Sequence, residues 1–255
     1  MVRWLKARPL SLPLTMALAA VVALTIFAAS CGSSGQAEVR FVHAIQDEGP
    51  LDIDVNGTPK FTGISFLGVL PNQPGYTAVP SGSVTLEGLL AGTTTEAFSD
   101  SADWGGGSQY TVVATGFSKT GTNGSNVAIL SIPDNIPSPP SGDVEFRVIH
   151  ASPSGPGTVD VYIELNPSTA PTLPITIPAL AYTQASKYYS FAYNPNNDPI
   201  APGFTVYVTG SGNSIPIITE QINPGTAGAV RTLVLTDVQD GTTMNSSFLE
   251  LSDAN

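Results

Sequence analysis

The chain has 255 residues, of which 11% are charged, and its 20 acidic residues outnumber its 9 basic ones to give a net charge of −11. So few lysines and arginines cannot neutralise a phosphate backbone, which argues against nucleic acid as a partner. The single cysteine excludes an intrachain disulfide and a thiolate metal cluster. The prevalence of Gly, Pro, Thr, Ser and Val favours short strands and turns over helices.

The first thirty residues have the layout of a secretory signal peptide. Arg3, Lys6 and Arg8 form a basic start, residues 14–29 form an apolar run, and Cys31 follows small residues. This junction resembles a bacterial lipobox, which predicts that Cys31 is lipidated and becomes the first residue of the mature protein. The alternatives are a cleaved soluble protein and a retained anchor, although the run is short for the roughly 20 residues of a spanning helix.

Cleavage before Cys31 leaves six basic against twenty acidic residues, a net charge of −14. Such a charge favours solubility and discourages approach to anionic lipid by any route other than a covalent anchor. We therefore expect an exported lipoprotein of the cell membrane or outer membrane that faces the periplasm or the exterior. Its expected partners are the membrane, through the lipid, and an envelope or extracellular protein or polysaccharide. No cofactor is expected.

One motif occurs twice in the remaining chain. The segments 40–44 (RFVHA) and 51–55 (LDIDV) return as 147–151 (RVIHA) and 159–163 (VDVYI). The only two histidines of the chain occupy the same position in the two copies. A motif that opens each half of the mature chain predicts two tandem domains of the same fold.

The second copy resembles the opening of the DUF4397 domain, a bacterial module of unknown function found in exported proteins. The shared pattern is Arg-x-x-His-Ala-Ser-Pro, a short Gly/Pro-rich loop and Val-Asp-Val-Tyr. The first copy matches less closely, with residues 45–48 (IQDE) replacing Ser-Pro and Asp54 standing where Tyr162 does, and residues 110–114 (YTVVA) are similar to that family's penultimate strand. Counted over both copies, the resemblance runs from Val39 to the C-terminus. It implies a β-sandwich-like domain and brings no known catalytic residue.

Alternating apolar and polar residues predict strands along both copies. Those of the first copy are expected at 38–44, 51–55, 61–69, 75–79, 83–89, 109–116 and 126–132. Those of the second are expected at 145–151, 158–163, 175–182, 188–193, 203–208, 215–221, 231–237 and 246–251. This number of short strands is typical of an immunoglobulin-like sandwich.

The expected fold is all-β, with two tandem immunoglobulin-like antiparallel β-sandwiches after an N-terminal signal/lipoprotein helix. Prolines between the copies favour an extended, semi-rigid linker. The predicted segments are a signal peptide 1–30, a tether 31–37, sandwich 38–134, a proline-rich linker 135–143 and sandwich 144–255.

Residues 52–57 (DIDVNG) match the start of an EF-hand loop, but the position that requires a bidentate glutamate holds Gly63. A strand with acidic residues facing solvent explains the pattern equally well. The weak candidates for a cation site are Asp47, Glu48, Asp52 and Asp54. We predict no metal site here.

His43 and His150 are candidate general bases, but no nucleophile or zinc motif accompanies them. A duplicated histidine in duplicated domains favours a structural role. We expect buried imidazoles at the ends of the first strands, hydrogen-bonded to the backbone of the next loop.

Arg40 and Arg147 lie within otherwise apolar strands, where an unpaired guanidinium is costly. Asp52 and Asp160, on the following strands, are the expected partners. Solvent-exposed arginines are the alternative.

Four aromatic residues are candidates for a surface that binds carbohydrate or a partner protein: Trp104, Tyr188, Tyr189 and Tyr193. The alternative is that their side chains pack in a core. Together the sequence favours a non-catalytic, lipid-anchored envelope protein that acts as a display, adhesion or binding module. The alternative is an envelope hydrolase with a site in the interdomain groove or at the His/Asp pairs. No catalytic residue is predicted.

Overall fold

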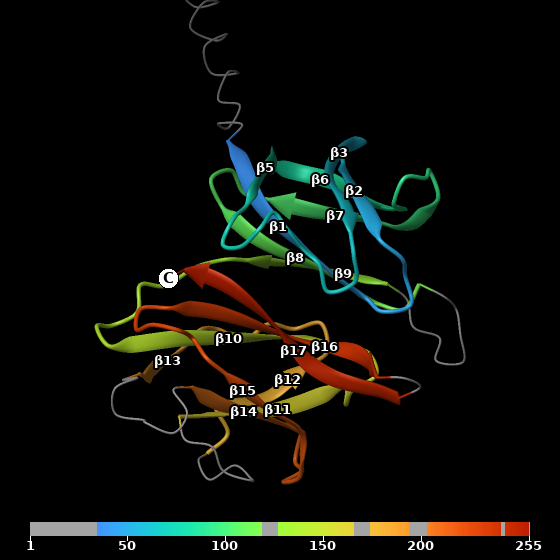
Figure 1. Cartoon of the computed structure of the whole chain (residues 1–255). Coiled ribbons are helices and arrows are strands. Elements are labelled where there is room, and N and C mark those ends of the chain that lie inside the picture. The colour runs from blue at the N-terminus through green and yellow to red at the C-terminus, as the bar shows by residue number, and fades with distance from the viewer. Residues whose placement is uncertain (1–34, 119–126, 166–173, 194–202, 241–242, 255) are drawn as a thin grey trace, which may run out of the picture. The chain divides into compact units, whose positions relative to one another are not determined.

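The computed structural model describes residues 35–118, 127–165, 174–193, 203–240 and 243–254, which belong to one compact unit starting at Gly35. Their regular structure is all-β, and seventeen strands form four sheets (Figure 1). Within these residues, no helix has the length and hydropathy needed to cross a membrane. Cys31 and the predicted signal segment lie outside the described residues.

The first half of the chain forms a β-sandwich-like body of two sheets, coloured blue to green in Figure 1. One sheet contains β1 (Gln36–Ile45), β4 (Val69–Leu70), β5 (Thr77–Pro80), β8 (Gln109–Gly116) and β9 (Ala128–Pro133). The other contains β2 (Leu51–Val55), β3 (Thr58–Ile64), β6 (Gly82–Leu90) and β7 (Glu96–Trp104). We call this the first body.

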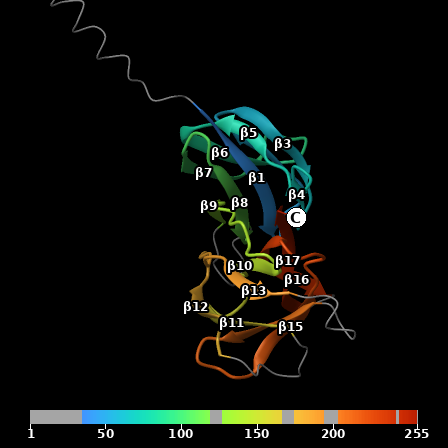
Figure 2. The same ribbon diagram turned by 90° about the vertical axis from the view of Figure 1, so that its left-hand side faces the viewer.

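The second half forms a second such body (Figure 2). One sheet contains β10 (Asp143–Ala151), β13 (Tyr189–Ala192), β16 (Val230–Asp240) and β17 (Thr243–Ala254). The other contains β11 (Thr158–Glu164), β12 (Ile177–Ala181), β14 (Phe204–Gly210) and β15 (Pro216–Ile222). We call this the second body.

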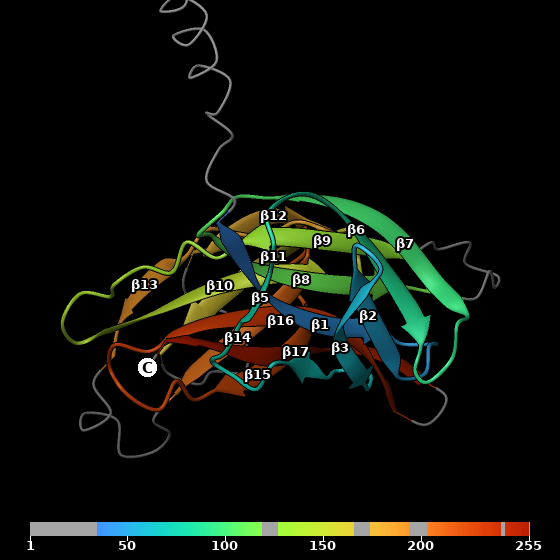
Figure 3. The ribbon, with the colours of Figure 1, turned by 90° about the horizontal axis from the view of Figure 1, so that it is seen from above.

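The two bodies share one strand order, as the duplicated motif predicted. The order β5-β1-β8-β9 corresponds to β13-β10-β16-β17, since β5 and β13 pair with equivalent ends of β1 and β10, and β3-β2-β6-β7 corresponds to β12-β11-β14-β15. The prediction of purely antiparallel sheets is wrong, because β1 pairs in parallel with β8, and β10 with β16. A parallel pair needs a long crossover connection. Here the strands of the opposite sheet, which come between the paired strands in the chain, provide it (Figure 3).

The strand predictions were accurate where both periodicity and turns were clear. β2 and β8 have the predicted bounds. The third predicted strand is divided into β3 and β4 by a turn in which Leu67 takes a positive φ of 60°. β7 was missed, because Phe98 and Trp104 are its only buried side chains and the rest of this edge strand is rich in Ser, Asp and Ala.

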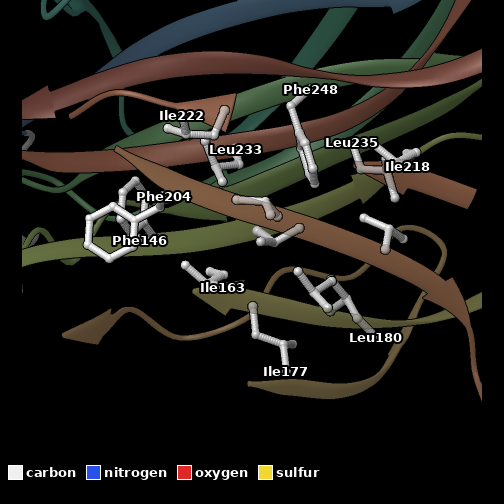
Figure 4. Close-up of a cluster of buried hydrophobic side chains, with 14 of the residues drawn as sticks. Phe146, Ile163, Ile177, Leu180, Phe204, Ile218, Ile222, Leu233, Leu235 and Phe248 are labelled. Atoms are coloured by element: carbon white, nitrogen blue, oxygen red, sulfur yellow. The ribbon is translucent and has the colours of Figure 1, made fainter. Parts of the chain in front are cut away.

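Each body has a hydrophobic core between its two sheets. In the second body, Phe146 packs against Phe204 with ring centroids 5.1 Å apart, and aliphatic side chains from both sheets fill the remaining space (Figure 4). Trp104 and Tyr193, predicted as either surface or core residues, are 1% and 3% exposed and belong to the two cores.

A third hydrophobic cluster joins the bodies. Val42 and Ala44 of β1 meet Ile149 and Ala151 of β10, and all four side chains are buried. The strands β1 and β10 are therefore buried on both faces, one against their own core and the other against the neighbouring body. This double burial explains why both strands carry almost no exposed residue. It also places any polar side chain on their outer faces inside the protein.

Candidate functional site

Arg40 lies on the face of β1 that is turned toward the second body, and it is fully buried. Its Nε donates to Thr111 Oγ1, 2.8 Å away on the adjacent strand β8. Its Nη1 donates to the Ser252 carbonyl of β17 at 3.2 Å, and its Nη2 forms an ion pair with Asp253. One guanidinium thus contacts both bodies.

Arg147 repeats this arrangement from the opposite side. Its Nε donates to Thr232 Oγ1 at 2.7 Å on β16, and its Nη1 donates to the Pro133 carbonyl of β9 at 3.2 Å. Its Nη2 forms an ion pair with Asp134, directly after β9 in the first body. Each arginine therefore pairs with an aspartate of the other body.

The first body holds its aspartate in place for this pairing. Asp134 accepts hydrogen bonds from Thr111 Oγ1 at 2.6 Å and from the Tyr76 hydroxyl at 2.8 Å. Tyr76 immediately precedes β5, so that the strand end fixes its position.

The second body holds Asp253 in the same way. Thr232 Oγ1 donates to Asp253 at 2.6 Å, and the hydroxyl of Tyr188, which immediately precedes β13, donates to it at 2.9 Å. We call the following eight residues the crossed cluster: Arg40, Tyr76, Thr111, Asp134, Arg147, Tyr188, Thr232 and Asp253.

The electrostatics of the crossed cluster keep its charges paired. Burial opposes the charge of Arg147, but Asp134, Tyr188 and Asp253 together outweigh burial and raise the pKa of that guanidinium. Burial also raises the pKa of the Tyr76 and Tyr188 hydroxyls, which therefore stay neutral donors. Each tyrosine ring also contacts its arginine, with the guanidinium carbon 5.3 Å from the Tyr76 centroid and 4.9 Å from that of Tyr188. Two cations and two anions give a neutral, hydrogen-bonded site that suits a structural role.

The predicted pairing of Arg40 with Asp52 and of Arg147 with Asp160 is wrong. The arginines face the neighbouring body, whereas these aspartates lie on strands of the opposite sheets and accept hydrogen bonds from backbone groups there. Asp52 accepts hydrogen bonds from the backbone N–H groups of Gly63 (2.7 Å) and Gly92 (2.8 Å). These backbone donors, Gly92 first, lower the pKa of Asp52.

Asp160 does the same in the second body. It accepts from the backbone N–H groups of Ala179 at 2.7 Å and Gly212 at 3.0 Å, and from Ser211 Oγ at 3.3 Å. Burial disfavours its charged form, but these donors prevail and lower its pKa. The duplicated aspartates therefore tie the neighbouring strand, β3 or β12, to the connection between β6 and β7 or between β14 and β15.

Asp134 and Asp253, the partners that the arginines have, were not predicted from the sequence. Both come just after the apolar stretch of the last strand of their half, in the segments 131–134 (SIPD) and 250–253 (ELSD). An alignment of the last strands of the two halves, in addition to their first strands, would have identified these two aspartates as equivalent residues.

His43 and His150 are fully buried at the ends of β1 and β10, and their bonds agree with the expected structural role. In each, Nδ1 accepts from the backbone N–H two residues on, at 3.2 Å for Ile45 and 3.4 Å for Ser152. Nε2 therefore carries the proton and donates to the carbonyl of Gly49 at 3.0 Å or Pro156 at 2.9 Å. Both ring nitrogens are engaged, and burial lowers the pKa of both imidazoles.

A hydroxyl near His150 has no geometry for nucleophilic catalysis. Ser152 is 1% exposed, and its Oγ donates directly to the Asp237 carboxylate. The same carboxylate accepts from the Ser154 backbone N–H at 3.0 Å. Catalysis of the serine type requires the imidazole to stand between the hydroxyl and the carboxylate. Here the three groups instead fix the loop that follows β10.

The weak cation-site candidates do not converge. Asp47 accepts from the Ser118 backbone N–H at 2.8 Å, and Glu48 accepts from that of Gly49 at 3.1 Å, while Asp52 binds its two backbone donors. Among the described residues, no group of three or more His, Cys, Asp or Glu side chains is placed to hold a metal ion.

An open groove of about 640 Å³ lies beside the crossed cluster. One wall is the end of β9 and the linker, and the other is the segment between β12 and β13. Both Arg147 and Tyr188 border the groove, next to the exposed Asn135 and Lys187. The predicted aromatic surface is therefore only partly present: Tyr188 is in the crossed cluster, and Lys187 Nζ lies 5.0 Å from the Tyr189 ring centroid.

The protein family described as a domain of unknown function, DUF4397, matches residues 37–162. The chain carries one DUF4397 domain. The match includes the whole first body and continues through β10 into β11. The second body, expected to be a second copy, is not assigned to that family by the match. A comparison with curated proteins finds no match.

Three solved structures are similar at a distance. The first, described as α-glucan binding by a streptococcal virulence factor, is 11% identical with a TM-score of 0.25, covering 82% of this chain and 96% of that one. A multi-modular glycogen-degrading pneumococcal virulence factor has the same identity and TM-score, covering 82% and 21%. CBMbc, of family CBM26, from Eubacterium rectale Amy13K in complex with maltoheptaose, is 9% identical with a TM-score of 0.21, covering 83% of this chain and 97% of that one.

Removal of one aspartate from the crossed cluster should destabilise the protein strongly. We expect Asp134→Ala and Asp253→Ala each to lower the free energy of unfolding by about 3–5 kcal/mol, because each removes the carboxylate nearest to a buried guanidinium. Chemical denaturation followed by circular dichroism measures this. As a control, the exposed Asp103 of β7 changed to Ala should alter stability by less than about 0.5 kcal/mol. Equal, small effects of all three changes would contradict the structural role.

The histidines should make stability depend on pH. Because burial lowers their pKa below the ordinary 6.5, the unfolded chain takes up protons first as the pH falls, and stability decreases from pH 7.5 to 5.5. Glu48 beside His43 and Asp237 beside His150 oppose this shift without reversing it. Thermal unfolding across this range should show a flatter dependence for His43→Gln and for His150→Gln than for the wild type. A steeper or unchanged dependence in both variants would show that the imidazoles are not buried neutral.

Proposed function

We propose that this protein is a non-catalytic binding module of the cell envelope, anchored by a lipid on Cys31, and that the groove beside the crossed cluster is its binding site. The observation that carries this proposal is that the repeated polar residues are engaged within the fold. Each repeated arginine, aspartate, histidine, threonine and tyrosine described above has its polar atoms in internal hydrogen bonds or ion pairs. A site that uses such groups for chemistry needs them free to reach a substrate.

The groove supports binding because two fixed walls form it. Residues of β9 and of the linker face the segment 183–188, and the crossed cluster ties these parts together through Arg147 and Asp134. A preformed site loses little conformational freedom when a ligand enters. Its volume of about 640 Å³ suits a short oligomeric ligand, a peptide or an oligosaccharide.

Further parts of the proposal rest on the repeat and on the N-terminus. We infer that the second body is a diverged second DUF4397 copy, since its strand order and its crossed-cluster residues are equivalent to those of the first. We also infer that both bodies are immunoglobulin-like. Export and lipidation are supported by the basic start, the apolar run and the small residues before Cys31. The hydrolase alternative gains no support from His43 and His150, whose ring nitrogens are both hydrogen-bonded.

The proposal is tested by blocking the groove in the full-length protein. Asn135→Trp places a large side chain at an exposed position of the groove wall, and Asn72→Trp places one at an exposed position outside it. We expect envelope material, separated into protein and polysaccharide fractions, to be retained by the wild type and by Asn72→Trp, and to be lost from Asn135→Trp. Equal retention by all three proteins would remove the groove from the function.

The anchor is tested in the same cells. Mass spectrometry should find an acylated Cys31 at the N-terminus, and Cys31→Ser should abolish labelling with a fatty-acid analogue. An intact Met1 terminus on the mature protein would contradict this part of the proposal.

A further inference from the structure

We propose that the groove binds a short, proline-containing, turn-forming peptide segment, chemically similar to a loop of this same chain that fills the equivalent position on the opposite side. The inference rests on the proposed function and names the ligand class of its site. It is based on the segments before β5 and β13, which differ in length between the two bodies.

Equivalence is established up to one turn in each body. Leu67 and Thr183 both adopt positive φ values, 60° and 69°. The backbone N–H of Leu67 donates to the His43 carbonyl, and that of Thr183 to the His150 carbonyl, both at 2.8 Å. The histidine N–H groups in turn donate to the carbonyl of the next residue, Gly68 at 3.1 Å and Gln184 at 2.9 Å. These turns therefore superpose residue by residue.

The segments that follow the turns differ in length. Both end at a tyrosine of the crossed cluster, Tyr76 or Tyr188. Tyr76 lies nine positions after Leu67, whereas Tyr188 lies only five after Thr183. The first body therefore has four more residues here, within the segment 70–75 (LPNQPG).

The additional residues of the first body reach the second body. The Ser252 backbone N–H, on β17, donates to Gln73 Oε1. A turn closed by the Gly75 N–H on the Asn72 carbonyl at 2.9 Å holds the loop in place. A proline-flanked, polar segment therefore lies against the last strand of the neighbouring body.

On the other side, the short segment of the second body cannot make the equivalent contact. The strand equivalent to β17 is β9, and the end of β9 forms one wall of the groove, while residues 183–188 form the other. The groove thus occupies the position that the loop 71–75 fills on the opposite side. Four missing residues correspond to roughly 13 Å of extended chain.

The chemistry of the walls fits such a segment. Pro133 and Pro137 offer apolar rings, and Asn135 and Lys187 offer side-chain donors for peptide carbonyls or for a side-chain amide. Proline residues fix φ and limit the conformations of a free peptide, which reduces the entropy lost on binding in a groove. An oligosaccharide is less well served, because Tyr188 has Arg147 against its ring and its hydroxyl bound to Asp253. The walls therefore favour peptide over sugar.

A synthetic peptide with the sequence of residues 70–76, LPNQPGY, tests the inference by calorimetric titration of the full-length protein. We expect saturable binding that is weakened about tenfold or more by Asn135→Trp and by insertion of Pro-Asn-Gln-Pro between Ser186 and Lys187. The insertion supplies the missing loop from within the chain. Asn72→Trp should bind like the wild type, and a peptide with both prolines changed to alanine should bind about tenfold more weakly.

The outcomes separate this inference from the proposed function. Absence of saturable peptide binding, or equal binding by Asn135→Trp, overturns the peptide ligand. If Asn135→Trp still loses a polysaccharide of the envelope fraction, the groove is a binding site for sugar and only the inference fails. If it loses neither ligand, both the inference and the proposed function fail. Thermal unfolding of the variants verifies that each is folded, and Asn135→Trp tests the inference alone if the insertion variant is not.

Discussion

Two buried guanidinium groups, each paired with a carboxylate of the opposite body, are the interaction on which the rest of the structure depends. Burial of a charge is tolerable only with a partner and with its remaining donors satisfied. Arg40 and Arg147 form their ion pairs with Asp253 and Asp134 of the opposite body only when the two bodies are docked. Separation of the bodies would break both pairs beside exposed apolar strands and leave Arg40 with only the 3.7 Å ion pair to Asp134 of its own body. Docking of the two bodies and folding are for this reason coupled. The same ion pairs hold the two walls of the groove in a fixed geometry.

The sequence was sufficient for most of the local structure. The repeat, nearly all strands and the hydrogen bonding of His43 and His150 follow from alternation, turn residues and duplication, which are properties of neighbouring residues. The partners of the arginines were predicted wrongly for a physical reason. Asp52 and Asp160 are near in sequence, but which carboxylate meets a guanidinium depends on which faces dock, and docking leaves no local periodicity.

The same limit applies to the groove. It arises from the difference in length between two loops that follow equivalent turns, Leu67–Tyr76 and Thr183–Tyr188. The sequence contains this difference, but it becomes interpretable only after the turns are superposed and the loop in the first body is seen against β17. The duplicated residues are the same in the interior of both bodies, whereas the loops at the junction of the bodies differ. We therefore assign the binding function to the groove, where the two otherwise equivalent bodies differ.

The central claim is that charges of one body are energetically coupled to charges of the other. A double-mutant cycle on Arg40→Met and Asp253→Leu, followed by denaturant unfolding, tests it most directly. Each single substitution leaves one member of this ion pair buried without the other, whereas the double substitution removes both members and leaves the Arg147–Asp134 pair in place. The account predicts that the double variant is more stable than the sum of the single effects implies, by about 1.5 kcal/mol or more. Additive effects within about 0.5 kcal/mol would contradict it, because they would mean that the two groups do not interact across the junction.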